Sequence, residues 1–394
     1  MAILNMTAAA NALKQFYLPG LREQMNYAAD PLLAELERDT ESVQGKEIVM
    51  ALRYGKQGGT GNRADDGDLP TPNPRKTVQA KWETKNVFSR IQISDKTIQA
   101  SHTNAGAFAN LLEKELDDAM TDAKDGLSRQ VYGDGTGFLA TCASGTNVAT
   151  ITVDTVQYLV EGQIVDITDS SGVPITNGTA RDITAVDETN LTFTVSGSAN
   201  LSPTATSKVI VNGNYNQELT GLAAVLTPNN TIYGLSRATY PWFNPSTIAV
   251  NGLVSELNIQ KALDDAERRT GAIVDYLSTS YGVRRSYQNL LTSTKSHVNT
   301  LELKGGWKAL AYAGGRGDIP MVATKYAPNG KLRALSRKNW KMYEMDDWNW
   351  LDEDGAVLSR VSGKAVWEAT LAKYCDLGCD LPRGNVDLTG LTEA

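Results

Sequence analysis

The hydrophobic pattern between residues 44 and 94 alternates with the two-residue period of a β-strand. Residues Glu47–Tyr54 predict an outgoing strand, and a return strand places Val78, Ala80 and Trp82 on one face. After Trp82 the alternation changes phase, which indicates a bulge or a change in the face that is buried. We therefore predict two strand segments on the return path.

A long polar tip separates the two predicted strands. Residues 55–74 read GKQGGTGNRADDGDLPTPNP, and this density of glycine, proline and aspartate is incompatible with regular structure. The whole segment is thus predicted to be an extended two-stranded ribbon. A lone ribbon is only marginally stable in water, so it needs a partner surface. Residues 44–94 carry nine Lys/Arg and five Asp/Glu, a net charge of +4, which leaves −11 on the rest of a chain whose total is −7.

A long amphipathic helix follows the ribbon. Between Ala105 and Gln130 the apolar residues recur every three or four positions, as on one helical face. The opposite face is acidic, and two readings of it stay open: a solvated surface, or a docking surface for a basic partner. Its carboxylates are Glu113, Glu115, Asp117, Asp118, Asp122 and Asp125.

Residues 146–214 differ sharply in composition from the rest of the chain. They hold 13 Thr and 10 Val, with no Trp, Met or Cys. Short β-branched runs separated by turn signals predict a small all-β module inserted into an α/β chain. The predicted strands are Ala149–Val153, Gln163–Ile167, Leu191–Val195 and Lys208–Val211.

From Gly221 onward, patterns of helix and strand alternate again. We predict strands at Ser246–Val250 and Ile273–Ser278, and helices at Leu253–Thr270 and Tyr281–Ser293. Two later strand pairs are expected, followed by a final helix or strand near Ala365–Tyr374. The pairs are Met321–Tyr326 with Lys331–Ser336, and Lys341–Glu344 with Val357–Val361.

Composition excludes several classes of function. No apolar run reaches the length of a membrane span, and the first residues lack the features of a signal peptide, so we expect a protein kept in the cytoplasm. With only His102 and His297, histidine-based acid–base catalysis is disfavoured. Cys375 and Cys379 have no nearby histidine, so buried thiols are a better interpretation than a zinc site. We expect no enzyme activity, no cofactor and no metal.

Two stretches resemble known binding motifs but lack residues or neighbouring elements that those motifs require. Residues 131–138, VYGDGTGF, lack the lysine and the preceding strand of a phosphate-binding loop, and they suit a turn that ends a helix. Residues 346–355, DDWNWLDEDG, lack the alternating carboxylates and the closing glutamate of a calcium loop.

The order of the parts, together with three local stretches, resembles a known family. The stretches are QVYGDGTG (130–137), LTGLAAVL (219–226) followed by YGLSRATYPW (233–242), and WEATLAKYCDLGCDLPRGN (367–385) followed by LTG (388–390). They are similar to the end of the spine helix, the entry to the axial domain and the closing segment of the tailed-bacteriophage major capsid proteins, the Hong Kong ninety-seven type. The chain is thus identified as an α+β capsid fold that carries an inserted all-β module.

This resemblance implies a domain plan and a function. The chain would form hexamers and pentamers that close an icosahedral shell around double-stranded DNA, without sequence-specific binding. Its virion would be assembled in the bacterial cytoplasm. The implied parts are an N-terminal arm (1–43), an extended β-hairpin loop (44–100), the spine helix and peripheral domain (101–145), the β module (146–214), the axial domain (215–335) and a return to the peripheral domain with the C-terminus (336–394).

The resemblance also implies partners and contacts. A portal protein and decoration proteins are expected, and, because the arm starts close to Met1, a separate scaffolding protein. Two other functions stay open: an encapsulin-type nanocompartment shell, and a β-rich adhesin or carbohydrate-binding protein. The ribbon is expected to lie on a neighbouring subunit. The residues expected at that contact are Arg53, Tyr54, Lys76, Lys81, Trp82, Lys85, Phe88, Glu113, Asp117 and Asp118.

Overall fold

The computed structural model describes residues 30–43, 46–101, 111–293, 300–302, 308–352 and 357–394. These residues group into two compact units. The smaller unit holds the described parts of 88–124 and 348–372, and the larger unit holds the remainder. Among the described helices, none is long and apolar enough to span a membrane.

A seven-stranded mixed sheet forms the centre of the larger unit. Its strand order is β13-β23-β18-β14-β17-β16-β15, with β13 parallel to β23, β14 parallel to β17, and the other neighbours antiparallel. The strands are β13 (Ser246–Gly252), β14 (Tyr276–Thr279), β15 (Thr300–Glu302), β16 (Lys308–Gly314), β17 (Gly317–Ala323), β18 (Leu332–Leu335) and β23 (Val386–Leu391).

Two helices pack their apolar faces on this sheet. Helix α6 (Glu256–Thr270) contributes Ile259, Ala262 and Ala266 to the buried core, and α7 (Tyr281–Ser293) contributes Val283, Tyr287 and Leu291. The Ser255 side chain caps α6 by accepting a hydrogen bond from the N–H of Asn258. Gly271, in the left-handed conformation (φ 72°), ends the helix. Both helices lie where the sequence pattern predicts them.

The expected pairing of the later strands is wrong. β17 and β18 do not pair with each other, because β14 lies between them and pairs with both. Likewise β19 (Trp340–Glu344) and β21 (Ser359–Arg360) both pair with β22 (Val366–Cys379), along different parts of its length. In the first case a strand from earlier in the chain lies between the expected partners, and in the second both expected partners pair with the strand that follows them.

The all-β module is a six-stranded antiparallel sheet with its own core. The strand order is β5-β10-β7-β8-β9-β6, and the core includes the fully buried Ile151, Ile167, Phe193 and Leu201. The strands are β5 (Phe138–Thr141), β6 (Thr150–Thr152), β7 (Ile164–Thr168), β8 (Arg181–Asp187), β9 (Thr192–Val195) and β10 (Lys208–Val211).

The module differs from the sequence expectation in two respects. It begins before residue 146, because β5 pairs with β10 at the edge of the same sheet. It also contains β8, which we did not predict. That strand buries only Ile183 and exposes most of its other side chains, so burial does not alternate along it.

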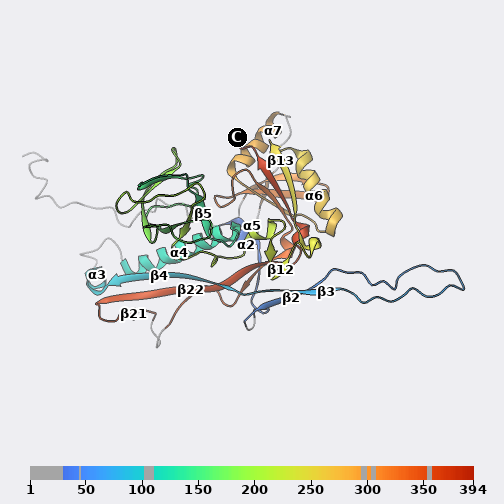
Figure 1. The fold of residues 1–394 in the computed structure, drawn as a ribbon, viewed down its shortest axis with the longest axis horizontal. Helices are drawn as coiled ribbons and strands as arrows, with labels where there is room; N and C mark the ends of the chain where they lie inside the picture. Colours follow the sequence, from blue (N-terminus) through green and yellow to red (C-terminus); the bar gives the residue numbers. More distant parts are fainter. Residues whose placement is uncertain (1–29, 44–45, 102–110, 294–299, 303–307, 353–356) are drawn as a thin grey trace, which may run out of the picture. The chain divides into compact units, whose positions relative to one another are not determined.

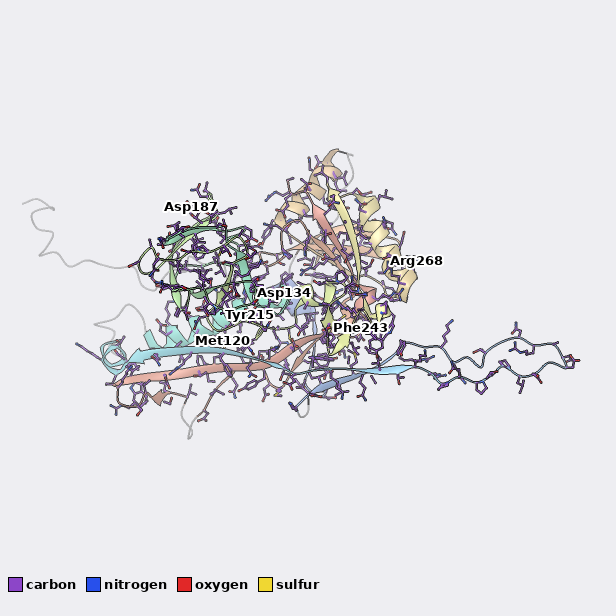
Figure 2. All side chains as sticks on the ribbon, viewed as in Figure 1. Met120, Asp134, Asp187, Tyr215, Phe243 and Arg268 are labelled. Atoms are coloured by element: carbon purple, nitrogen blue, oxygen red, sulfur yellow. The ribbon has the colours of Figure 1, made fainter. Side chains whose placement is uncertain are left out.

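The chain enters and leaves the module at adjacent points. The N–H of Asn216 donates to the carbonyl of Thr136 at 3.1 Å, and Figure 2 shows Asp134 and Tyr215 at this end and Asp187 at the far end. Replacing residues 138–211 with a short Gly/Ser linker is therefore expected to leave the rest of the chain folded. Circular dichroism and limited proteolysis would measure this. Insoluble protein with the seven-stranded sheet unfolded would contradict it.

A second sheet in the larger unit is built on the end of β22. Its residues 375–379 pair with β19, and β19 pairs in parallel with the short strand β1 (Glu37–Asp39). Helix α2 (Pro31–Glu35) precedes β1, and the Asp30 carboxylate caps it by accepting hydrogen bonds from Leu32 and Leu33. The C-terminal strand β23 instead joins the seven-stranded sheet, so the return that we expected over residues 336–394 is divided between two sheets.

The larger unit also holds shorter elements and two two-stranded sheets, β2-β3 and β11-β12. The elements are β2 (Ile48–Arg53), β3 (Thr77–Trp82), α5 (Leu222–Leu226), β11 (Thr231–Ile232), β12 (Leu235–Ser236) and the 3-10 turns η1 (Pro241–Phe243), η2 (Arg337–Asn339) and η3 (Pro382–Gly384). Strands β2 and β3 form a sheet of their own, which is the predicted ribbon.

The smaller unit combines long strands with a helix. Strand β4 (Lys85–Ser94) pairs with β22, and its Arg90 side chain forms an ion pair with Glu368. The other elements are α3 (Asp95–Ser101), β20 (Asn349–Trp350), β21 and the first part of α4 (Leu111–Tyr132), whose residues from Asp125 onward belong to the larger unit. The predicted change of phase after Trp82 is confirmed as a break between β3 and β4, which join different sheets. The first residues of the predicted long helix, 105–110, lie outside the described part of the chain.

Candidate assembly surface

The ribbon has two different faces. Its antiparallel register runs from Ile48 opposite Trp82 to Arg53 opposite Thr77. Ile48, Ala80 and Trp82 are buried on the inner face, whereas the outer face carries Val49, which is 51% exposed. Alternation on a strand sends successive side chains to opposite faces, so this division follows directly from the sequence.

Trp82 anchors the base of the ribbon to its own chain. Its ring centroid lies 4.5 Å from that of Tyr233 and 5.4 Å from that of Tyr343, and only 8% of the residue is exposed. The backbone N–H of Lys81 donates to the Tyr233 carbonyl at 2.8 Å. A side chain at Gly378 would collide with Tyr343 and crowd Trp82, so glycine is required there. We had expected Trp82 to contact a neighbour, and the structure places most of its ring against its own chain.

A second aromatic contact holds the ribbon at its outer end. The Tyr54 ring stacks on Trp242 with a centroid separation of 5.0 Å and an interplanar angle of 5°. The Tyr240 ring meets the Tyr54 ring edge-on, with a centroid separation of 5.9 Å. Tyr54 nevertheless remains 40% exposed, so a second surface can still reach it. The ribbon is thus fixed at residues 54 and 82, and only its tip extends beyond.

The tip is a continuation of the ribbon without regular hydrogen bonding. An added Cβ at Gly55, Gly58 or Gly61 would lie 2.8, 2.8 or 3.6 Å from Lys76, Asn73 or Pro70 respectively, so the two sides run next to each other. Figure 1 shows this excursion running beyond β2 and β3. Leu69 near its end is 89% exposed, an unusual position for a large apolar side chain unless it contacts another molecule.

The positive charges of the ribbon are mostly unpaired within the described chain. Arg53, Lys76 and Lys81 are exposed and form no ion pair with any described residue. Lys85 donates from Nζ to the carbonyl of Asn216 at 3.1 Å, and Lys46 pairs with Glu83 at 3.4 Å. Arg53, Lys76 and Lys81 are therefore available to another surface.

The acidic face of α4 is less available than the sequence suggests. Asp118 pairs with Lys114 at 2.9 Å, one helical turn away, and Asp125 accepts from Lys325 and Tyr326 at 2.5 and 2.6 Å. Asp117 is exposed. The side chain of Glu113 lies outside the described residues. Phe88, on β4 in the smaller unit, is 54% exposed.

A buried carboxyl group lies near the ribbon base. Asp376 on β22 is 1% exposed, and its Oδ1 accepts from the N–H groups of Thr220 at 2.7 Å and Leu377 at 2.9 Å. Its Oδ2 has no partner among the described residues. Burial raises the pKa of Asp376 from 3.8 to about 7, against the lowering effect of these hydrogen bonds.

No three His, Cys, Asp or Glu side chains of the described residues gather as metal ligands. All three cysteines are free and buried, and burial raises the pKa of Cys375 to about 12, so its thiol stays protonated at neutral pH. The phosphate-loop-like stretch at 131–138 covers the end of α4, the turn that follows it and the first residue of β5, with Gly135 and Gly137 both at φ 83°.

Solved structures resemble the chain over its whole length. A capsid asymmetric unit of cyanophage A-1(L) superimposes with a TM-score of 0.62, covering 99% of this chain and 100% of the other at 13% identity. The capsid of a native GTA particle gives 0.55, with 99% and 100% coverage at 8% identity. This chain has the Hong Kong ninety-seven type capsid fold.

An encapsulin complex also resembles the chain. This complex, named holo-SrpI and from Synechococcus elongatus PCC 7942, matches with a TM-score of 0.51, covering 99% of this chain and 96% of the other at 10% identity. No protein-family model and no curated protein matches the sequence. The fold class predicted from the order of elements is therefore confirmed, and at these identities the likeness concerns the capsid fold alone.

Proposed function

We propose that this chain is a major capsid protein of a tailed bacteriophage, forming hexamers and pentamers that close an icosahedral shell around double-stranded DNA. The observation that carries the proposal is the ribbon. Its base is fixed to its own chain through Trp82, while its outer face and tip are exposed. A two-stranded excursion of this length is marginal without a partner surface, and neighbouring subunits of a shell would supply one. The capsid fold supports the same conclusion.

The proposed contact is formed by the exposed part of the ribbon and by Phe88. Arg53 and Lys76 supply positive charge, and Asp117 is an exposed acidic counterpart on α4. Each exposed pair contributes only ~0.2–1 kcal/mol, so charge would mainly set the register and the rate of encounter. Burial of apolar groups such as Phe88 and Leu69 would supply more, at ~1.5–3 kcal/mol for each fully buried side chain.

The further partners remain part of the proposal. A scaffolding protein would direct assembly, a portal would occupy one vertex, and decoration proteins would bind the finished shell. The all-β module, with its own core, is suited to display on the shell without altering the fold beneath it. The virion would be assembled in the bacterial cytoplasm.

An encapsulin-type nanocompartment is the second candidate function. It is favoured by the full-length match to the encapsulin complex, although that TM-score is lower than the phage capsid's. The two proposals differ in their contents, since one shell encloses DNA and the other a protein cargo. The all-β module alone would suit an adhesin, which would be a stable monomer with affinity for a ligand.

Electron microscopy of the expressed protein tests the proposal directly. We expect closed shells, or rings of five and six copies, in negative-stain images, together with a sedimentation coefficient far above that of a monomer. Nuclease-protected DNA in particles from infected cells would support the phage capsid, and a co-purifying enzyme would support the nanocompartment. A stable monomer, also when co-expressed with a scaffolding protein, would contradict both shell proposals.

A further inference from the structure

The apex of the ribbon carries the opposite charge to its flanks. A turn closed by a 3.0 Å hydrogen bond from the Gly67 N–H to the Ala64 carbonyl presents Asp65, Asp66 and Asp68. The only cation next to them, Arg63, donates to the backbone carbonyls of Asn62 and Asp68 instead of to a carboxylate. The three apex carboxylates are exposed and form no ion pair with a described residue.

A cavity of about 310 Å³ lies at the base of the ribbon. Lys81 and Lys85 line it, and the hydrogen bond from the Lys85 Nζ to the Asn216 carbonyl fixes the position of that ammonium group. Trp82 also lines the cavity, and its buried indole N–H has no acceptor among the described residues. We name the cavity lined by these three residues the base pocket.

The base pocket is positive once its own acids are accounted for. Glu218 lines it but is buried in an ion pair with Arg129 and also accepts from Asn214. Asp134, the other acid in the lining, accepts hydrogen bonds from the N–H and hydroxyl of Thr136. Thr136 is neutral and brings no positive charge to Asp134, so two lysines face one carboxylate that is in no ion pair with a described residue, and the lining has a net positive charge that suits an anionic group.

The apex cannot reach the base pocket of its own chain. The two sides of the tip run next to each other as far as Gly61 and Pro70, and Trp82 holds the other end of the ribbon in place. At ~3.3 Å per residue, the extended stretch from Pro70 to Lys81 spans roughly 36 Å. Figure 1 shows the apex at the far end of this excursion. Any carboxylate of the apex that enters a base pocket must belong to a second copy.

We propose that the acidic apex of one subunit (Asp65, Asp66 and Asp68) docks in the base pocket (Lys81, Trp82 and Lys85) of a second copy of this chain. This rests on the proposed function, since it specifies which surfaces meet when the subunits assemble. The contact is head-to-tail, with different surfaces on the two copies. A head-to-tail contact gives a ring when its rotation closes, which is the geometry of a hexamer or a pentamer. The proposal pairs Lys81 and Lys85 with the carboxylates of the ribbon apex and not with the acidic face of α4.

Charge reversal with rescue tests this contact. The pocket variant Lys81→Glu with Lys85→Glu, and the apex variant Asp65→Lys with Asp66→Lys and Asp68→Lys, should each slow assembly on the order of ten-fold at low salt. Combining the two sets of substitutions restores opposite charges across the contact, so assembly should recover towards the wild-type rate. Light scattering would follow assembly. Lys338→Glu with Lys364→Glu, at two exposed lysines outside the pocket, is the matched control and should assemble at the wild-type rate.

A disulfide test measures proximity directly and does not depend on rates. Asp66→Cys combined with Lys81→Cys should give covalent multimers under oxidising conditions, because the two positions of one chain cannot meet. Asp66→Cys with Lys364→Cys is the control and should stay monomeric on a non-reducing gel. The contact is wrong if wild-type chains assemble and the charge variants assemble equally fast. It is also wrong if the combined charge variant is not rescued and the cysteine pair gives no multimers. In both cases the proposed function stands. If wild-type chains never assemble, both are wrong.

Discussion

Replacing Trp82 with alanine is expected to lower the free energy of unfolding of the unassembled subunit by about 3–5 kcal/mol. The residue is 8% exposed and packs against Tyr233 and Tyr343, so truncation leaves a cavity where the ribbon joins the rest of the larger unit. The loss should also free the ribbon base, so protease cleavage within residues 46–87 should become faster. Denaturant titration followed by tryptophan fluorescence measures the first effect, and limited proteolysis the second.

Tyr54→Ala is the matched aromatic control. Tyr54 also packs on the same unit, against Trp242, but it remains 40% exposed. Its truncation removes less buried surface and should cost clearly less than that of Trp82. The loss of unfolding free energy in Trp82→Phe should lie between the losses in Tyr54→Ala and Trp82→Ala. If Trp82→Ala cost under about 1 kcal/mol, the base of the ribbon would not be held in the way that the aromatic contacts indicate.

Lowering the pH from 8 to 4 is expected to stabilise the subunit through Asp376. The folded-state pKa of this carboxyl group, about 7, lies above its unfolded value of 3.8, because burial disfavours the charged form. The folded state therefore binds the proton more tightly. The resulting stabilisation is fully present below the unfolded pKa, and it is lost as the pH rises through 7. At 1.36 kcal/mol per pKa unit the full effect is about 4 kcal/mol.

The comparison with Asp376→Asn isolates this contribution. Asparagine keeps an oxygen that can accept from Thr220 and Leu377 but has no charge to desolvate. The variant should be less sensitive to pH between 4 and 8, and at pH 8 it should match or exceed the wild type in stability. Asp187→Asn is the exposed control. The pKa of Asp187 is lowered by hydrogen bonds from Asn190, so its effect has the opposite sign. Equal pH profiles for the wild type and Asp376→Asn would contradict the prediction.

Protonation of Asp30 should stabilise the folded subunit, as protonation of Asp376 does. Burial raises its pKa to about 6, although Tyr132 and two backbone N–H groups donate to it. It caps α2, so the position of the first described helix depends on the same carboxyl group. The pH dependence that remains in Asp376→Asn should therefore include a smaller stabilisation as the pH falls through 6.

Local pattern was enough to predict most elements and the fold class. Helix α7 and strand β10 were predicted with their observed bounds, and the ribbon and the β module were predicted from strand alternation and composition. These signals are local, because the side chains of one helix or strand repeat with a fixed period whatever the rest of the chain does. The order of the elements then pointed to the capsid fold, which the structural likeness confirms.

The tertiary structure alone decided which strands pair and which ribbon residues are free. The insertion of β14 between β17 and β18 depends on contacts between segments far apart in the sequence, and no local period records them. For the same reason Trp82 and Lys81, adjacent in the chain, have different surroundings, since alternation sends one towards Tyr233 and Tyr343 and the other outward. The sequence by itself determined that a basic ribbon exists. Only the fold showed that its tryptophan is buried within one chain, that its lysines line a pocket, and that its acidic apex lies beyond the reach of that pocket.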